Sequence, residues 1–178
     1  MDCLKFFYRV IFILLISITS SCNLSMGEPD TGTITTTKLE LIKISPVQQV
    51  YNQGDFITLK LDLPSINNYF DGPSVNLLQS TNDYDAQLAL LFSQLFVDNE
   101  VTVLKGNQGE FSNWFYAIYN PNNGNYELEV KIKLNRTGNY SFVNGGNIVV
   151  KKSKYFIYYM NTNIEWTNNS DQINFTVI

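Results

Sequence analysis

Apolar and polar residues alternate with a period of two along most of the chain beyond residue 38. In the clearest stretch, 126–134, Tyr, Leu, Val, Ile and Leu are separated by Glu and Lys. Because successive side chains of a β-strand point to opposite faces, this pattern predicts strands with one face in a core and the other in water. Further strands are expected at residues 39–44, 56–63, 75–78, 100–105, 113–119, 148–150, 155–159 and 172–178.

One segment, residues 83–96, interrupts this alternation. Its apolar residues follow steps of four, three, one and three positions: Tyr84, Leu88, Leu91, Phe92 and Leu95. That spacing fits one face of an α-helix, and Asp83 is a suitable N-cap. The segment is therefore predicted to be an amphipathic helix, although residues 88–96 are apolar enough to form a buried strand instead.

The turns between the strands point to one antiparallel domain over residues 39–178. Asn120-Pro121-Asn122-Asn123-Gly124 is typical of a hairpin loop. Thr137-Gly138-Asn139-Tyr140 resembles the tyrosine corner of immunoglobulin-like domains. A plain glycine turn before a β-favouring tyrosine would have the same sequence. Phe142 stands where antibody domains place a cysteine, so the disulfide form is excluded. Together, the strands, the helix expected at 83–96 and this resemblance predict a mainly β fold, a mostly antiparallel immunoglobulin-like β-sandwich with one inserted α-helix.

The first residues have the order of a secretory signal peptide. Lys5 and Arg9 precede the apolar run 10–16, and small residues follow it. The run is much shorter than the roughly 20 residues that a transmembrane helix needs. Export, and not a permanent membrane span, is the expectation.

The end of this segment, Thr19-Ser20-Ser21-Cys22, resembles the lipobox of bacterial lipoproteins. Thr19 stands where leucine is usual, a departure familiar in the Bacteroidetes group. The resemblance implies cleavage of residues 1–21, lipidation of Cys22 and anchoring in a membrane of the cell envelope. The outer membrane is the expected one, with the periplasmic or surface face left open. Residues 22–38 would then be the lipidated cysteine and a flexible tether. An ordinary cleaved signal with Cys22 as an incidental thiol is the alternative.

Composition narrows the chemistry. The net charge is −4, and removal of residues 1–21, which carry a net +1, would leave −5. A mildly acidic surface argues against nucleic acid as a partner. The chain contains no histidine, and its second cysteine, Cys3, lies inside the signal. The usual general base, metal ligand and nucleophile pairs are therefore missing, and no catalytic site, metal site or cofactor is expected.

Four carboxylates are candidates for chemistry. Asp83 and Asp85 form an Asp-x-Asp pair, but the rest of a calcium loop is missing, so helix capping explains them better. Asp98 and Glu100 flank an Asn turn and could pair as catalytic carboxylates, although solvated loop charges are commoner.

Aromatic residues are the more interesting candidates for ligand binding. Their alternation along strands places most of them in the core. Trp166 is the exception, because residues 162–171 form a polar, Asn-rich stretch. It is the candidate ligand-binding residue, since aromatic faces stack on sugar rings and apolar ligands.

We therefore expect a cell-envelope lipoprotein that acts as a non-catalytic binding or adhesion module for a glycan or protein ligand. Two alternatives remain open, a structural or accessory subunit of an envelope complex and a carboxylate-dependent glycan-processing enzyme. A β-sandwich supports all three kinds of function.

Overall fold

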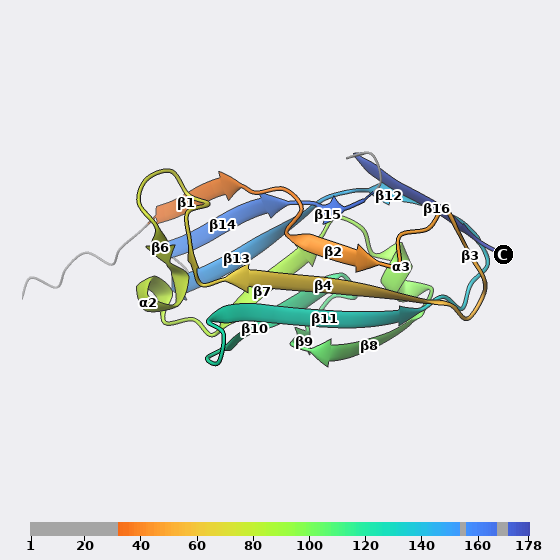
Figure 1. The fold of residues 1–178 in the computed structure, drawn as a ribbon, viewed down its shortest axis with the longest axis horizontal. Coiled ribbons are helices and arrows are strands. Elements are labelled where there is room, and N and C mark those ends of the chain that lie inside the picture. The colour runs from red at the N-terminus through yellow and green to blue at the C-terminus, as the bar shows by residue number, and fades with distance from the viewer. Residues whose placement is uncertain (1–31, 154–155, 167–170) are drawn as a thin grey trace, which may run out of the picture. The chain divides into compact units, whose positions relative to one another are not determined.

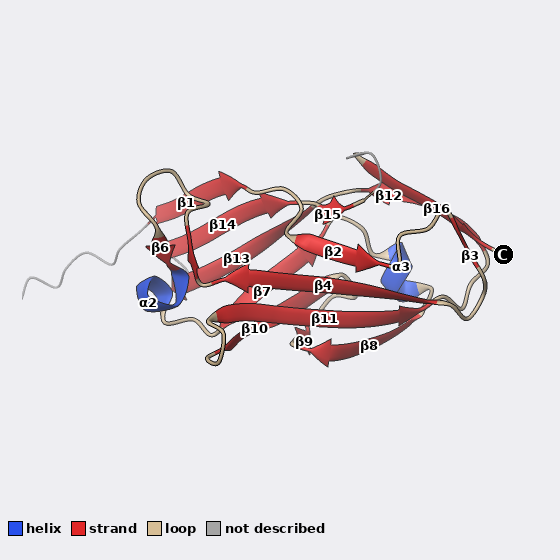
Figure 2. Cartoon of the chain, viewed as in Figure 1, coloured by secondary structure: helices blue, strands red, loops and turns tan. Residues whose placement is uncertain are grey.

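The computed structural model describes residues 32–153, 156–166 and 171–178. The export segment, Cys22 and the first part of the predicted tether lie outside these ranges, so lipidation stays a prediction. The described part is mainly β, with two short helices (Figure 2). Neither helix in these ranges has the length and apolar character needed to cross a membrane.

The elements follow the chain as labelled in Figure 1. The first half comprises β1 (Gly32–Thr37), β2 (Ile42–Ser45), β3 (Val50–Tyr51), β4 (Phe56–Pro64), β5 (Ile66–Asn67), β6 (Val75–Asn76), α2 (Leu77–Thr81), β7 (Asp85–Leu90) and α3 (Gln94–Val97). The second half comprises β8 (Glu100–Lys105), β9 (Asn107–Gln108), β10 (Trp114–Asn120), β11 (Asn125–Lys133), β12 (Gly138–Val143), β13 (Gly146–Ser153), β14 (Phe156–Thr162), β15 (Ile164–Glu165) and β16 (Gln172–Val177). The predicted strands at 56–63, 100–105, 113–119, 126–134 and 172–178 are confirmed to within a residue at each end.

The main sheet has the order β1-β14-β13-β7-β10-β11-β4-β2-β15, with β8 beside β11 and β9 beside β10. Most neighbours are antiparallel, but β1 pairs with β14 and β2 with β15 in parallel. A smaller sheet, β12-β16-β3, contains a third parallel pair, β3 with β16. The mainly β class is confirmed, but the expected antiparallel immunoglobulin-like sandwich is not, because three early strands run beside three late strands in the same direction and the sheets are mixed.

The main sheet is curled into a half-barrel. β14 lies near one end of the strand order and β15 at the other, yet only Asn163 separates them in the chain. The side chain of Asn144, which is buried, closes the join. Its Nδ2 donates to the carbonyl of Ile164 at 2.9 Å, and its Oδ1 accepts from the Ile164 N–H at 2.8 Å. One amide thus satisfies both backbone groups of a residue at the seam.

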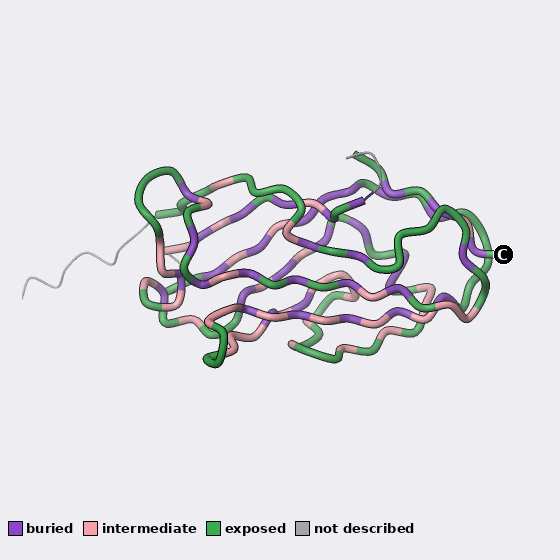
Figure 3. Tube along the Cα trace, in the orientation of Figure 1, coloured by how far each residue is buried: buried purple, intermediate pink, exposed green. Residues whose placement is uncertain are grey.

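The core follows the predicted alternation. β4 and β11 pair along their length, and the facing residues are buried: Ile57 with Ile132, Leu59 with Val130, Leu61 with Leu128 and Leu63 with Tyr126. The residues between them are more exposed, as the alternating colours of Figure 3 show. There Lys60 and Glu129 form an ion pair of 3.2 Å. Burial of apolar area on this one face is the main stabilising contribution of the pair.

The predicted helix at residues 83–96 is wrong over most of its length. Residues 85–90 form strand β7, between β13 and β10, and only Gln94–Val97 is helical. Ala86, Leu88 and Leu90 are buried and alternate with more exposed neighbours. Asp83 is no N-cap, since its carboxylate accepts hydrogen bonds from the N–H groups of Asp85 and Lys151. A small buried alanine concealed the period of two.

A second correction concerns the tether. Residues 32–37, assigned to it by composition, form β1, which pairs with β14 over six residues. The strand is polar and largely exposed, so backbone pairing and not burial holds it. Backbone hydrogen bonds place few demands on side chains, which is why composition was misleading here.

The segment that resembles a tyrosine corner holds Tyr140 by a local hydrogen bond. Tyr140 begins the buried face of β12, and its hydroxyl donates to the carbonyl of Arg136 at 3.1 Å. Its ring stacks on Phe175, with centroids 4.9 Å apart. The hydroxyl is thereby satisfied while the ring fills the core between β12 and β16.

β10 and β11 separate after three residue pairs, and β8 and β9 occupy the gap between them. Gly106 joins β8 to β9 at this point with a φ of 88°. A Cβ atom there would lie 2.3 Å from the carbonyl oxygen of Tyr116 and 2.8 Å from Leu128 Cδ1. We call the place where β10 and β11 separate the fork. Residue 106 of the fork must be glycine because its backbone angle is left-handed and because there is no room for a side chain.

Candidate functional site

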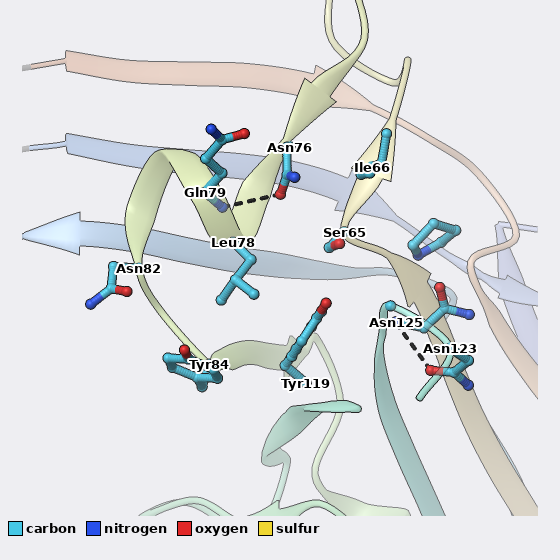
Figure 4. A pocket seen from close by; sticks show the side chains of 12 residues that line it. Ser65, Ile66, Asn76, Leu78, Gln79, Asn82, Tyr84, Tyr119, Asn123 and Asn125 are labelled. Atoms are coloured by element: carbon cyan, nitrogen blue, oxygen red, sulfur yellow. Dashed lines mark hydrogen bonds between the residues drawn. The ribbon is translucent and has the colours of Figure 1, made fainter. Parts of the chain in front are cut away.

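A pocket of about 550 Å³ lies where β4 passes into β5, between α2 and the β10–β11 hairpin (Figure 4). This volume is in the range of small-molecule sites. The pocket is lined by Pro64, Ser65, Ile66, Asn76, Leu78, Gln79, Asn82, Tyr84, Tyr119, Asn123, Gly124 and Asn125. Three segments that are separate in the sequence thus meet around one opening.

Two tyrosines form the wall opposite α2. Tyr84 is 55% exposed, and its ring makes a T-shaped contact with the ring of Tyr119, with centroids 6.1 Å apart. Tyr119 in turn packs against Tyr126 at 5.5 Å. The Tyr119 N–H donates to the carbonyl of Tyr84 at 2.9 Å, so the backbone also fixes the exposed ring. The exposed Tyr84 ring is therefore supported by the partly buried ring of Tyr119 and, behind it, the buried ring of Tyr126.

Tyr126 anchors this row. Its side chain is fully buried, and its hydroxyl donates to the carbonyl of Asp83 at 2.7 Å. Burial, together with the charge of Asp83, raises the pKa of Tyr126 well above its ordinary value. The hydroxyl therefore stays protonated and keeps Asp83, the residue before Tyr84, in place.

The α2 wall presents amides. Asn76 caps the helix, because its Oδ1 accepts from the Gln79 N–H at 3.0 Å. Asn82 ends it with a φ of 56°, and its N–H donates to the carbonyl of Leu78 at 2.7 Å. Within the described ranges, the side-chain amides of Gln79 and Asn82 make no hydrogen bond to protein. Both are exposed and available to a ligand.

The hairpin wall is fixed by its own hydrogen bonds. Asn123 Oδ1 accepts from the Asn125 N–H at 3.1 Å, and Asn123 Nδ2 donates to Glu127 Oε1 at 2.9 Å. Asn125 Nδ2 donates to Asp62 Oδ1 at 2.7 Å. The amides on this side therefore shape the pocket, while those of Gln79 and Asn82 on the α2 side are left unpaired.

The side chain of Glu127 accepts several hydrogen bonds at the hairpin. Its carboxylate receives hydrogen bonds from Asn123, Asn120 and Lys105, in falling order of effect, which lower its pKa below the ordinary 4.5. The Lys105 Nζ to Glu127 Oε2 distance is 3.1 Å. The carboxylate is thus ionised and engaged on the outer side of the hairpin, and it does not line the pocket.

The lining suits binding better than catalysis. It combines an aromatic face, apolar side chains and primary amides, and none of its residues is Asp, Glu, Lys or Arg. Amides donate and accept hydrogen bonds but do not exchange protons near neutral pH. Among the described residues, no cluster of three or more Asp, Glu, His or Cys side chains could hold a metal ion.

Trp166, the ligand-binding residue predicted from sequence, is largely buried. Only 6% of it is exposed, and its ring lies 6.3 Å from that of Phe175. It lines a second cavity of about 580 Å³ together with Lys43, Val47 and Lys60. Residues 167–170, which follow it, lie outside the described ranges. Its role toward a ligand stays a prediction, and it is not part of the pocket beside α2.

The other candidates are not brought together as an acid and base pair in that pocket. Asp98 Oδ1 forms an ion pair of 2.9 Å with Arg136 Nη1. Glu100 is exposed and lies opposite Lys133 on β11. Neither lines the pocket. The carbonyl of Asp83 accepts from the Tyr126 hydroxyl, and Asp85 pairs with Ile118 on β10, so both act here through their backbones.

Sequence reasoning missed this site because no local pattern marks it. Tyr84 has the position of a helix core residue, and Asn123 and Asn125 are typical turn residues. Only the tertiary structure, in which α2, the start of β5 and the hairpin surround the same pocket, brings these side chains to one opening. The available signal was the density of Asn around the turns, which has an ordinary structural explanation.

Neither a protein-family model nor a curated protein sequence matches the chain. The function is therefore inferred from the residues of the site themselves.

Proposed function

We propose that this protein is a cell-envelope lipoprotein whose β domain is a non-catalytic binding module. Residues 1–21 would direct export, and Cys22 would carry the lipid. A protein held by several acyl chains stays at a membrane without a spanning helix. The domain would then meet its ligand close to the envelope, on the outer membrane.

The observation that carries the binding role is the pocket beside α2. It exposes the face of Tyr84 and two unpaired amides, those of Gln79 and Asn82, on a backbone that is fixed on both sides. Ordered, unpaired recognition groups in one opening are typical of a binding site. The neutral lining supports binding without turnover.

We also propose that the domain is related to immunoglobulin-like sandwiches. The hydrogen bond from Tyr140 to the carbonyl of Arg136 supports this relationship, as it is the contact that defines a tyrosine corner. The parallel pairs at the sheet ends would be an elaboration of that fold.

The anchor is tested by fractionation of intact cells that express the native chain or Cys22→Ala. The native protein is expected in the membrane fraction and Cys22→Ala in the soluble fraction. Protease treatment of intact cells then distinguishes the surface face from the periplasmic face. Equal fractionation of both proteins would contradict the lipid anchor.

The binding role is tested by screening the full chain against neutral glycans, acidic glycans and peptides. Tyr84→Ala is compared with Phe111→Ala, which removes a ring of similar exposure, 54%, outside the pocket. Binding of any class that is lost in Tyr84→Ala and kept in Phe111→Ala supports the proposal. If nothing binds, or if both variants behave like the native protein, the pocket is not the binding site.

A further inference from the structure

We propose that the pocket beside α2 binds one sugar unit of a neutral glycan, with the face of Tyr84 stacked against the sugar ring. This inference rests on the proposed binding function and specifies the ligand class. Three features of the pocket carry it: its charge, its aromatic face and its unpaired amides.

The charge around the pocket disfavours anionic ligands. No Lys or Arg lines it. Four carboxylates, those of Asp62, Asp83, Asp85 and Glu127, lie within two residues of the lining along the chain. Those of Asp62, Asp83 and Glu127 already accept hydrogen bonds from protein groups. A phosphate or uronic acid placed here would meet like charges and no cation, and it would lose hydration without compensation. Nucleotides and acidic sugars are therefore poor candidates.

The aromatic face has the properties of a stacking platform. Tyr84 is held through its backbone, whose carbonyl accepts from the Tyr119 N–H, and through a T-shaped contact between the two rings, so little motion is lost when a ligand covers it. A pyranose ring presents several C–H groups on one side, which pack on an aromatic face, and hydroxyl groups around its rim. Leu78 and Ile66 add apolar contact on the other walls (Figure 4).

The third feature is the two side-chain amides of the lining, those of Gln79 and Asn82, which make no hydrogen bond to the described residues. Gln79 lies on α2 and Asn82 at its C-terminal end, and both line the same opening as Tyr84. A primary amide carries one acceptor and two donor hydrogens side by side, which matches a pair of neighbouring hydroxyls. A wholly apolar ligand would leave these amides without partners in the complex, which is costly. Stacking and neutral hydrogen bonding together select a sugar.

The test is calorimetric titration of the full chain with defined probes. Cellohexaose, maltohexaose, mannohexaose and xylohexaose represent neutral glycans, trigalacturonic acid an acidic one, and tetra-alanine a neutral peptide. At least one neutral hexasaccharide is expected to bind. Tyr84→Ala should weaken it by about tenfold or more, a free-energy change of about 1.4 kcal/mol. Gln79→Ala should weaken it less, and Phe111→Ala should bind like the native chain.

The possible failures are distinguishable. Binding of only tetra-alanine or trigalacturonic acid, lost in Tyr84→Ala, would refute the neutral sugar and leave the binding module standing. A hexasaccharide that binds all variants equally would refute this pocket as the sugar site. No binding by any probe, in this set and in the wider screen, would overturn both proposals. Equal thermal unfolding temperatures of Tyr84→Ala and Phe111→Ala would confirm that both variants are folded.

Discussion

Replacement of Gly106 by alanine tests whether the fork between β10 and β11 is as tight as the structure indicates. The residue has a φ of 88°, and its missing Cβ would lie 2.3 Å from a backbone oxygen of β10. That oxygen belongs to Tyr116, which also pairs with β7, so it cannot retreat without disturbing the sheet. Gly54 offers a matched control, because its φ is 93° and a Cβ added there would have no neighbour within 4 Å.

Gly106→Ala and Gly54→Ala share one destabilising contribution to the free energy of unfolding, and a second contribution applies to only one of them. A left-handed backbone angle costs an alanine about 1–2 kcal/mol, and this applies at both sites. Forcing a methyl group into filled space adds about 1–3 kcal/mol, and this applies at Gly106 alone. The loss of unfolded-state entropy on replacing glycine is similar at the two sites and cancels in the comparison. Gly106→Ala is therefore expected to be about 1–3 kcal/mol less stable than Gly54→Ala.

Urea unfolding followed by tryptophan fluorescence measures this difference, since Trp114 lies on β10 close to the fork. The free energy of unfolding is obtained by linear extrapolation, and similar slopes for both variants show that they unfold from equally compact states. Equal stability of the two variants would refute the reasoning, because it would mean that the fork accommodates a side chain. A larger loss of unfolding free energy in Gly54→Ala than in Gly106→Ala would refute the reasoning more strongly.

Two further predictions concern hydrogen bonds. Asn144→Ala should lower the free energy of unfolding by about 2 kcal/mol or more, because it leaves the buried N–H and carbonyl of Ile164 unpaired at the seam of the sheet; thermal unfolding checks this, and an unchanged midpoint would contradict it. Glu127→Gln should make the free energy of unfolding fall less steeply as the pH is lowered into the acid range. Since the folded pKa of Glu127 is lowered, its contribution is full above the ordinary value near 4.5 and is lost as the pH falls through the lower folded value. Chemical unfolding between pH 3 and 7 checks this, and parallel profiles for the native chain and the variant would contradict it.

The amino-acid sequence by itself determined most of the strands. Along β4 and β11, every second residue is apolar, and each residue of the inward-facing set is buried, because a strand with one face in a core leaves no choice of period. The hairpin at 120–124 follows from its turn residues, and the strand that begins near Tyr140 follows the Gly138 turn. These features depend on neighbours in the chain, so local chemistry is enough to predict them.

The tertiary structure alone decided what depends on distant segments. The parallel pairing of β1 with β14 uses backbone groups, which have no sequence signature, so Thr-rich residues 32–37 resembled a tether. β7 is a strand because β13 and β10 lie on both sides of it, and this packing overrides the helical spacing of its large residues. The pocket exists because α2, Tyr84 and the hairpin meet at one end of the curled sheet. Its residues carry no shared pattern, since each was placed by a different local requirement.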